Sequence, residues 1–303
     1  MIKIDDVEIL TVLEDMTWSG ATDICTRNLT FSILYNPLKK DIPKYKVRVG
    51  SKVEWIEGNK TLFLGYVEQM PYNTDDDTMT LSCQDFMARL ARSTFVGRMK
   101  GTLTQLANKI CATFGLKNGI QSNSKHIHNI VSEGDLTYFD VLRTACNSVY
   151  PTGVLYLDKD TLKITDDTIV NTFEIGYNIR SSYFTQSMAD MVNKVLIISN
   201  EGKVLKSLED TQSIRQFGLF QATYNYNKEC KNNIAEAQKL MKGVQNEGEI
   251  TVNNDNNCIS GRLIKIYEPV NNLNGIFKIV TDSHTIGTND SYMVLGVKYV
   301  TNG

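Results

Sequence analysis

The stretch VTDSHTIG, residues 280–287, places an aspartate, a serine and a histidine next to one another. Serine hydrolases use these three residue types as a catalytic triad, and the chain has only three histidines. Adjacent residues of an extended strand point to opposite faces, however, so Ser283 cannot easily donate a hydrogen bond to the ring of His284. The sequence also lacks a GxSxG turn of the kind that exposes a nucleophilic serine. We therefore expect Asp282, Ser283 and His284 to lie where a strand runs into a loop, without a catalytic role.

A second group of chemically capable residues is the HIH sequence at His126 and His128. Two residues of separation would place both imidazoles on one face of a strand, a spacing that transition metals can use. Only Glu133 and Asp135 are close enough in the sequence to supply a further ligand. We expect a solvated polar strand here and no metal site.

Two polar runs could bind ions. Residues 74–77, TDDD, resemble the start of a calcium loop but lack its downstream glycine and glutamate, so they predict a turn. The basic run at residues 39–48, KKDIPKYKVR, contains Asp41 and Pro43, which favours protection of an edge strand over phosphate binding. No Walker or GxGxxG loop is present, so we expect no cofactor and no enzymatic activity.

Composition describes an ordinary globular protein. Hydrophobic residues make up 42% and charged residues 22% of the 303-residue chain. The formal net charge of -2 does not point to nucleic acid or an anionic membrane as a partner. No apolar run reaches the roughly 18 residues of a membrane span, and residues 1–10 do not resemble a signal peptide. We expect the chain to be made in, and at first to reside in, a cytoplasm.

The cysteines show no CxxC pair and no spacing typical of a zinc site or a disulfide framework. Most of them have apolar neighbours, which is typical of reduced, buried thiols. The six are Cys25, Cys83, Cys111, Cys146, Cys230 and Cys258.

The elements that must position these residues are mostly strands. Alternating apolar residues with turn signals between them predict strands at 7–13, 27–35, 45–57, 61–70 and 78–86. In the second of these, Leu29, Phe31 and Ile33 should share one face. Short, evenly spaced strands favour a small antiparallel barrel or sandwich over residues 1–97.

The periodicity then becomes helical. Apolar stripes predict a helix behind Asp85, one capped by Thr102 or Thr104 and stopped by Gly115, and one with Asp135 near its start. A hairpin over 152–166 follows, so residues 98–170 should form a small α/β domain.

Strand character returns in the last part of the chain. A strand is predicted at 193–199, followed by a long polar connection, a helix within 230–245 and strands over 258–300. The fold class is therefore α+β and mostly β, with a second β-barrel domain at 171–303 that carries a helical insertion around 228–247.

The two β regions resemble each other. Residues 50–57, GSKVEWIE, match residues 261–268, GRLIKIYE, and the register resumes with Phe63 against Phe277. In this alignment Met79 meets Met293, Leu81 meets Leu295, Glu68 meets Asp282, and Met70 meets His284. Two related barrels explain the match, and two unrelated barrels with similar strand patterns remain the alternative.

Four segments, in this order and spacing, resemble the XkdQ/YqbQ group of baseplate hub proteins, relatives of the late-control D proteins, from contractile phage tails and R-type bacteriocins. The first is WSGATDICTRNLTFSIL, and the second is VGSKVEWIEGNKTLFLGYVEQM leading to LSCQDFMARL. The third is SEGDLTYFDVLRTAC. The fourth is CISGRLIKIYEP, GIFKIVTDSHTI and SYMVLGVKY, with DTQSIRQFG upstream.

The resemblance implies a homotrimer in which each chain supplies two barrels like those of tail-tube proteins. Three such chains would present a pseudo-six-fold ring, which suits a hub between a six-fold tail tube and a three-fold spike. The implied partners are the tail tube protein, the spike protein and other baseplate proteins, without specific nucleic-acid binding. The implied location is the bacterial cytoplasm during assembly and then the particle. The family supplies no catalytic residues.

Interface residues are harder to choose from the sequence. Aromatic residues concentrate in interface cores, so Trp18 and Trp55 are candidates, and His284 is a candidate subunit contact. For Trp18 and Trp55 a position in the core of one chain is at least as good an explanation, and for His284 the alternative is a contact within its own loop. Two other functions stay open: a peptidoglycan-binding module, because residues 101–116 faintly resemble a LysM helix, and a cell-wall hydrolase that uses His284.

Overall fold

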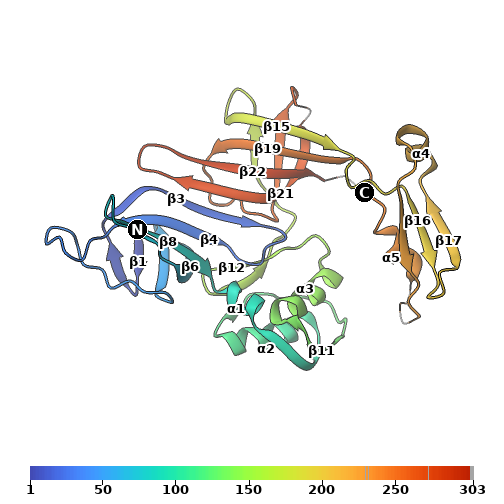
Figure 1. The fold of residues 1–303 in the computed structure, drawn as a ribbon, viewed down its shortest axis with the longest axis horizontal. Helices are drawn as coiled ribbons and strands as arrows, with labels where there is room; N and C mark the ends of the chain where they lie inside the picture. The colour runs from blue at the N-terminus through green and yellow to red at the C-terminus, as the bar shows by residue number, and fades with distance from the viewer. Residues whose placement is uncertain (229, 231, 272, 301–303) are drawn as a thin grey trace. The chain divides into compact units, whose positions relative to one another are not determined.

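The computed structural model describes residues 1–228, 230, 232–271 and 273–300. Contacts divide the chain into two compact units (Figure 1). Unit 1 comprises Met1–Ser182 together with the chain from Glu249 onward, and unit 2 comprises Tyr183–Gly248. Strands dominate over helices, which confirms the predicted α+β, mostly β class. In the described part of the chain, no helix is long and apolar enough to cross a membrane.

The main feature of unit 1 is a sheet of 14 strands. Hydrogen bonds connect β15-β19-β22-β21-β3-β4-β8-β6-β5-β1-β2 in this order, while β7 pairs with β8, and β20 pairs with β21 and β14. The strands are β1 (Ile2–Ile4), β2 (Val7–Ile9), β3 (Val12–Ala21), β4 (Asn28–Leu34), β5 (Lys52–Glu57), β6 (Lys60–Gln69), β7 (Tyr72–Asn73), β8 (Thr78–Asp85), β14 (Ile169–Glu174), β15 (Ile179–Ser187), β19 (Gln245–Asn253), β20 (Leu263–Glu268), β21 (Leu273–Ile286) and β22 (Ser291–Tyr299). Among the described residues the path ends at β15 and at β2, so no closed barrel is found.

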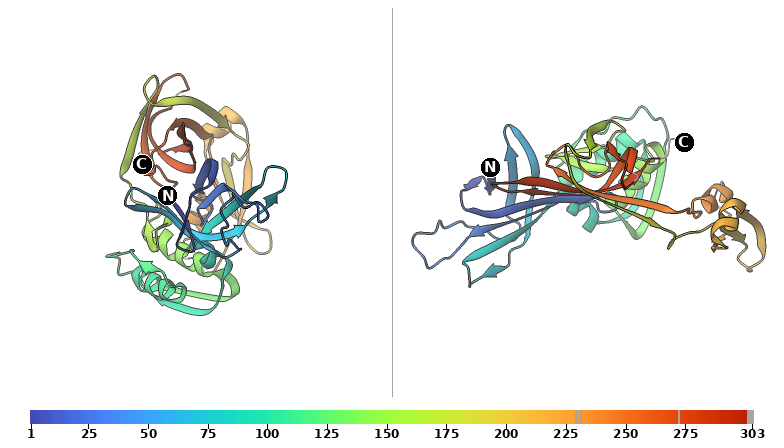
Figure 2. Two further views of the ribbon diagram at one scale, coloured as in Figure 1. Left: turned by 90° about the vertical axis from the view of Figure 1, so that its left-hand side faces the viewer. Right: turned by 90° about the horizontal axis from the view of Figure 1, so that it is seen from above.

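The N-terminal and C-terminal β regions meet where β3 pairs with β21. The pairing is antiparallel and places Thr281 opposite Ala21 and Ile286 opposite Met16. Strand β21 is 14 residues long, so its first half can pair with β20 and its second half with β3, while β22 runs along its other edge. Figures 1 and 2 show β3 and β21 side by side. One sheet thus connects the two regions for which separate barrels were predicted, and the two-barrel arrangement stays a prediction.

Strand β4 shows how the sequence pattern builds this sheet. Its residues alternate between buried and half-buried positions along the whole strand. Leu29, Phe31 and Ile33 are each at most 1% exposed, which confirms the predicted shared face. They belong to a core that also contains Trp18 and Trp55.

The two matched segments of the sequence form similar meanders. Strands β5, β6 and β8 pair consecutively and antiparallel, as do β20, β21 and β22. The registers differ, because Trp55 lies opposite Phe63 whereas Phe277 lies opposite Ile264. A β-bulge between Ile279 and Thr281 also shifts the alternation of faces in β21. The ungapped alignment therefore does not match burial beyond the bulge, where it sets a half-buried Glu68 against a buried Asp282.

A helical region follows β8 in unit 1. It contains helices α1 (Met87–Arg92), α2 (Leu103–Phe114) and α3 (Tyr138–Val149), the two-stranded sheet of β9 (Thr94–Gly101) and β11 (His128–Thr137), and the small sheet of β10 (Lys117–Asn118), β12 (Leu155–Asp158) and β13 (Thr161–Ile164). Its core is separate from that of the main sheet and includes Leu106, Ile110, Leu142 and Leu162.

Helix caps agree with part of the sequence prediction. Thr102 caps α2 in a capping box with Gln105, and Gly115 ends the helix at φ 68°. Helix α3 begins at Tyr138, and its N-cap is Thr137, which forms a capping box with Asp140. The carboxylate of Asp135 instead accepts from Ser132 within β11.

Unit 2 has a small core of its own. It contains β16 (Lys194–Ile198), β17 (Val204–Glu209) and β18 (Gln221–Asn225) in one sheet, with helices α4 (Thr211–Phe217) and α5 (Asn233–Gln238). The buried residues of this core are Val195, Ile197 and Ala237. The long polar connection predicted after residue 199 contains three elements that were not predicted, β17, α4 and β18. These elements bury few side chains, so they carry little apolar periodicity for sequence reasoning to detect.

Candidate functional site

The aspartate-serine-histidine cluster lies inside β21, with strands on both sides. His284 is opposite Trp18 of β3 and Met293 of β22. Asp282 and His284 are buried on one face, whereas Ser283 points to the other face and is half-buried. The alternation predicted from the sequence is confirmed. The predicted position near a strand end is also confirmed, because β21 ends at Ile286 and a loop follows it.

Asp282 forms a buried ion pair with Arg27, which precedes β4. Nη1 of Arg27 donates to Oδ1 of Asp282 at 3.0 Å, and Nη2 donates to Oδ2. The N–H of Ser260 donates to Oδ1 at 2.6 Å. Burial alone would raise the pKa of Asp282, but the charge and hydrogen bonds of Arg27, together with the nearby His284 ring, whose Nε2 lies 3.2 Å from Oδ2, hold that pKa below its usual range. The carboxylate is therefore ionised, and it connects the start of β4 with β21.

Aromatic rings enclose this ion pair. The guanidinium carbon of Arg27 lies 3.9 Å from the ring centroid of Trp18, in cation–π contact. The Trp18 ring lies 5.0 Å from the ring of His284 and 5.5 Å from that of Trp55, edge-on to the latter. Nδ1 of His284 lies 2.8 Å from Oδ1 of Asn254. Residues from β3, β5, β21 and two connecting segments thus form one cluster.

The structure brings together all three residues that the sequence suggested as interface candidates. Trp18, Trp55 and His284 are 4%, 3% and 0% exposed, so their side chains pack within one chain. Any contribution to subunit contacts would come through the strands that they hold. The interface assignment itself stays a prediction.

The geometry of the cluster does not support hydrolysis at His284. The side chains of His284 and Asp282 are both 0% exposed, so a substrate could not reach the ring. Ser283 lies on the opposite face of β21 and cannot serve as its nucleophile. The cluster can position strands, and it has no open site for a reacting group.

The histidines His126 and His128 lie close together but do not belong to a set of metal ligands in the part of the chain that the structure describes. Their rings are in edge contact at 4.6 Å, and burial lowers the pKa of His128. The expected solvated polar strand is not found, because His126 is exposed but precedes β11, and His128, the first residue of that strand, is buried. The carboxylate of Asp135 accepts hydrogen bonds from Ser132 and from the N–H of Glu133. Among the described residues, no group of three or more potential metal ligands is found.

The cysteines are reduced thiols, as expected. Cys83, Cys111, Cys146 and Cys258 are buried, and Cys25 and Cys230 are half-buried. Burial raises the pKa of Cys83 to about 12 and that of Cys25, Cys111 and Cys146 to about 11. At neutral pH these four are protonated and poor nucleophiles.

Comparison with known proteins is decisive for the family. A family model described as YQBQ-like matches residues 16–298, nearly the whole chain. The chain belongs to the YQBQ-like family. No curated protein sequence matches it. The expected resemblance to the XkdQ/YqbQ group is thereby confirmed.

Solved structures show the same fold as this YQBQ-like chain. The 43 kDa tail protein of prophage MuSo2 from Shewanella oneidensis has a TM-score of 0.75 at 17% identity, over 98% of this chain and 96% of its own. A tail protein from Neisseria meningitidis has a TM-score of 0.71 at 15% identity, over 98% and 95%. An E. coli type VI secretion component has a TM-score of 0.52 at 11% identity, over 99% and 77%. At these identities the likeness concerns the fold alone.

Sequence reasoning missed one buried carboxylate of the YQBQ-like chain. Asp85 ends β8, and its Oδ1 accepts from the N–H of Met87 at 3.1 Å. It was expected to be the N-cap of α1, but Phe86 occupies that position. Burial raises the pKa of Asp85 to about 7, and the N–H donors and the charge of Arg27 only partly oppose this rise. The burial pattern of β8 depends on its partners β4 and β6, so the strand-to-helix transition was the one signal that a single sequence carries at this position.

Proposed function

We propose that this YQBQ-like chain is a structural baseplate hub of a contractile phage tail or a tail-like bacteriocin. It joins the six-fold tail tube to the three-fold spike and has no enzymatic role. The observation that carries the proposal is the continuous sheet through the β3–β21 junction, in a fold shared over nearly full length with two tail proteins.

A trimer reconciles the symmetries of tube and spike. Each chain contributes two meanders, β5-β6-β8 and β20-β21-β22, so three chains contribute six similar units around one axis. In this proposal the meanders belong to tube-like domains at residues 1–97 and 171–303, with the α/β domain at 98–170 between them. The Arg27–Asp282 cluster then sets the angle between the two domains of one chain.

Further structures support a place near a spike. The E. coli protein mentioned above is described as structurally similar to the T4 tail proteins gp27 and gp5. The fold is also found in a Francisella PdpA–VgrG complex, with a TM-score of 0.53 over 97% of this chain and 54% of that one. The proposed partners are accordingly the spike protein, the tail tube protein and other baseplate proteins.

Mass measurement in solution followed by particle averaging tests the proposal. We expect three copies of the 34.1 kDa chain, about 102 kDa in total, to assemble. The trimer forms either from the chain alone or when the spike protein is added, in which case the mass of the spike adds to this value. Averaged images should show a ring with six similar lobes. A chain that stays monomeric and forms no ring even with spike protein would overturn the hub assignment.

A further inference from the structure

Strand β2 leaves one edge of the main sheet open. It is the last strand on its side and pairs only with β1, across a two-residue turn at Asp5 and Asp6 with φ values of 48° and 67°. In such a hairpin the residues that flank the turn, Ile4 and Val7, exchange hydrogen bonds. The next residue, Glu8, therefore points its N–H and C=O away from β1, toward the free edge. This edge can accept another strand.

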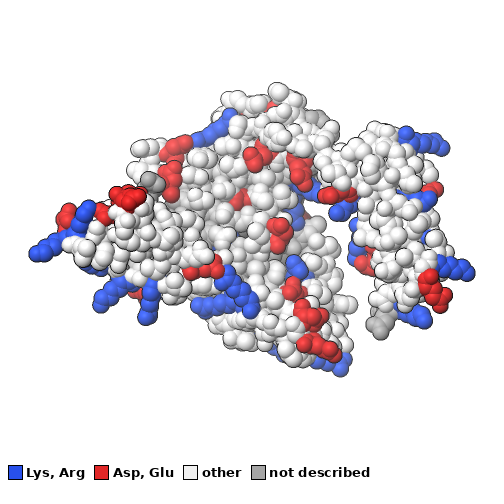
Figure 3. All heavy atoms as spheres, viewed as in Figure 1, with Lys and Arg blue, Asp and Glu red and all other residues white. Residues whose placement is uncertain are grey.

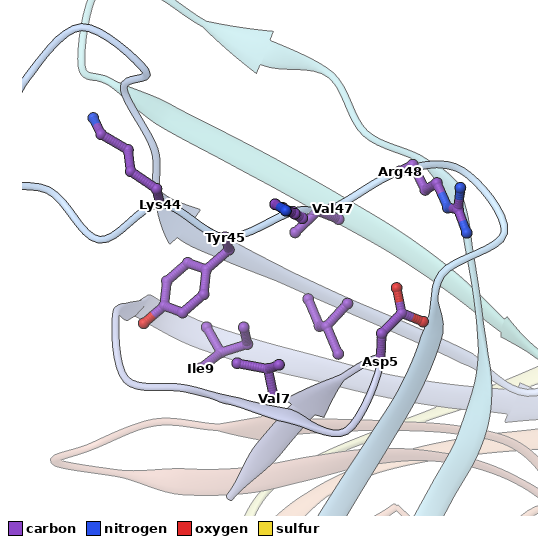
Figure 4. A pocket seen from close by; sticks show the side chains of 9 residues that line it. Asp5, Val7, Ile9, Lys44, Tyr45, Val47 and Arg48 are labelled. Carbon is purple, nitrogen blue, oxygen red and sulfur yellow. The ribbon is translucent and has the colours of Figure 1, made fainter.

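A groove runs along this edge. Residues 44–48 follow its far side without belonging to a strand, and the cavity between them and the β1–β2 hairpin has a volume of about 640 Å³. Figure 4 shows the Tyr45 ring turned toward Ile9, with Val7 beside it. The N–H of Leu10 donates to Oη of Tyr45 at 3.0 Å, which holds one end of the groove closed. The apolar side chains that line it are Ile4, Val7, Ile9, Tyr45 and Val47.

The charged residues of the groove are mainly basic. Lys44, Lys46 and Arg48 alternate with the apolar residues of the far side and are exposed. Lys44 donates to backbone carbonyls of its own loop, whereas Lys46 and Arg48 form no ion pair among the described residues. The one acid of the lining, Asp5, already accepts from Ser51 and from the N–H of Lys52. Lys and Arg side chains project from this end of unit 1 in Figure 3.

We propose that this groove binds an extended segment of a partner protein as an added strand beside β2. The segment alternates apolar and acidic residues, so that its apolar side chains cover Val7 and Val47 while its carboxylates meet Lys46 and Arg48. Main-chain pairing supplies affinity in this kind of recognition, and alternate side chains supply specificity. The five residues 44–48 of the far side correspond to about 17 Å of extended chain. The proposal does not depend on the hub assignment.

The apolar floor distinguishes this site from a general anion site. Phosphate groups would meet Lys46 and Arg48 but leave Val7 uncovered. Val7 is 58% exposed in the single chain, so covering it favours an occupant with apolar side chains. The basic run was predicted to protect an edge strand, and it does lie beside the edge strand β2. The cavity between residues 44–48 and β2 is the space that an added strand would occupy.

Fluorescence anisotropy with a labelled peptide tests the proposal. The probe has about ten residues that alternate valine with glutamate, and the matched peptides replace glutamate with lysine or place the same residues in blocks. We expect the alternating acidic peptide to bind best. Lys46→Glu/Arg48→Glu should weaken it at least about tenfold, and so should Val7→Asp. Lys109→Glu/Lys125→Glu, the same charge change at exposed positions in the helical region, should leave binding unchanged.

Each other outcome overturns the proposal. Equal binding of the acidic and the blocked peptide would show that no strand is added. Displacement by a short DNA duplex, without any effect of Val7→Asp, would make the groove a polyanion site. Stronger binding of a peptide of residues 166–177 from this chain would assign the groove to a second copy instead. Unchanged circular dichroism and melting of each variant show that lost binding is not lost folding.

Discussion

The Arg27–Asp282 pair offers the sharpest test of how the two β regions are held together. We expect Asp282→Asn to destabilise the chain strongly. The change preserves side-chain size but leaves the guanidinium of Arg27 without a counter-charge, where the side chains are 9% and 0% exposed. Double substitution with apolar residues, Arg27→Met with Asp282→Leu, should be less damaging, because it removes both charges from the interior.

The size of the effect follows from burial. Removing one partner of a buried ion pair costs about 3–5 kcal/mol, mainly because the other charge stays buried and unpaired. Asp282 also accepts from Ser260, so an asparagine that turns its amide toward that N–H loses a further bond. Since the pKa of Asp282 is lowered in the folded chain, this stabilisation is present above the ordinary aspartate pKa and is lost as pH falls below it.

Urea unfolding followed by tryptophan fluorescence measures the loss in the free energy of unfolding with probes that lie in the cluster itself. The chain has two tryptophans, and both Trp18 and Trp55 lie in the cluster. Asp290→Asn is the matched control, because Asp290 pairs with Arg180 on the surface, where water screens the charges. A loss for Asp282→Asn under about 1 kcal/mol, or no larger than that of the control, would refute the reasoning.

Two further predictions concern buried acids and thiols. Because the pKa of Asp85 is raised to about 7, the folded chain keeps a proton that the unfolded chain loses above pH 3.8, so the free energy of unfolding should fall as pH rises from about 4 to 7. The Asp85→Asn chain should lack this slope, which corresponds to about 4 kcal/mol at most, and urea titrations at several pH values that show equal slopes would contradict it. In the native chain at pH 7.5, a thiol reagent should label only Cys25 and Cys230, and slowly, whereas in guanidinium it should label six thiols. Rapid labelling of more than two would show that the buried cysteines are accessible.

The sequence by itself determined the local elements. Alternation fixed the shared face of Leu29, Phe31 and Ile33, and Thr102 with Gly115 marked the ends of α2. It also excluded a Ser283–His284 dyad, because neighbours on a strand face opposite ways. All these signals act between residues a few positions apart, which is why a single sequence can carry them.

Only the tertiary structure decided how these elements combine. Arg27 and Asp282 are 255 positions apart, and no local pattern indicates that they meet. The bulge at Ile279 turns Asp282 and His284 into the core, whereas unbroken alternation from Ile279 would turn Thr281 and Ser283 inward. Strand pairing depends on which edges become neighbours after the chain collapses. The β3–β21 junction, which makes one sheet of the two β regions, is therefore a property of the folded chain alone.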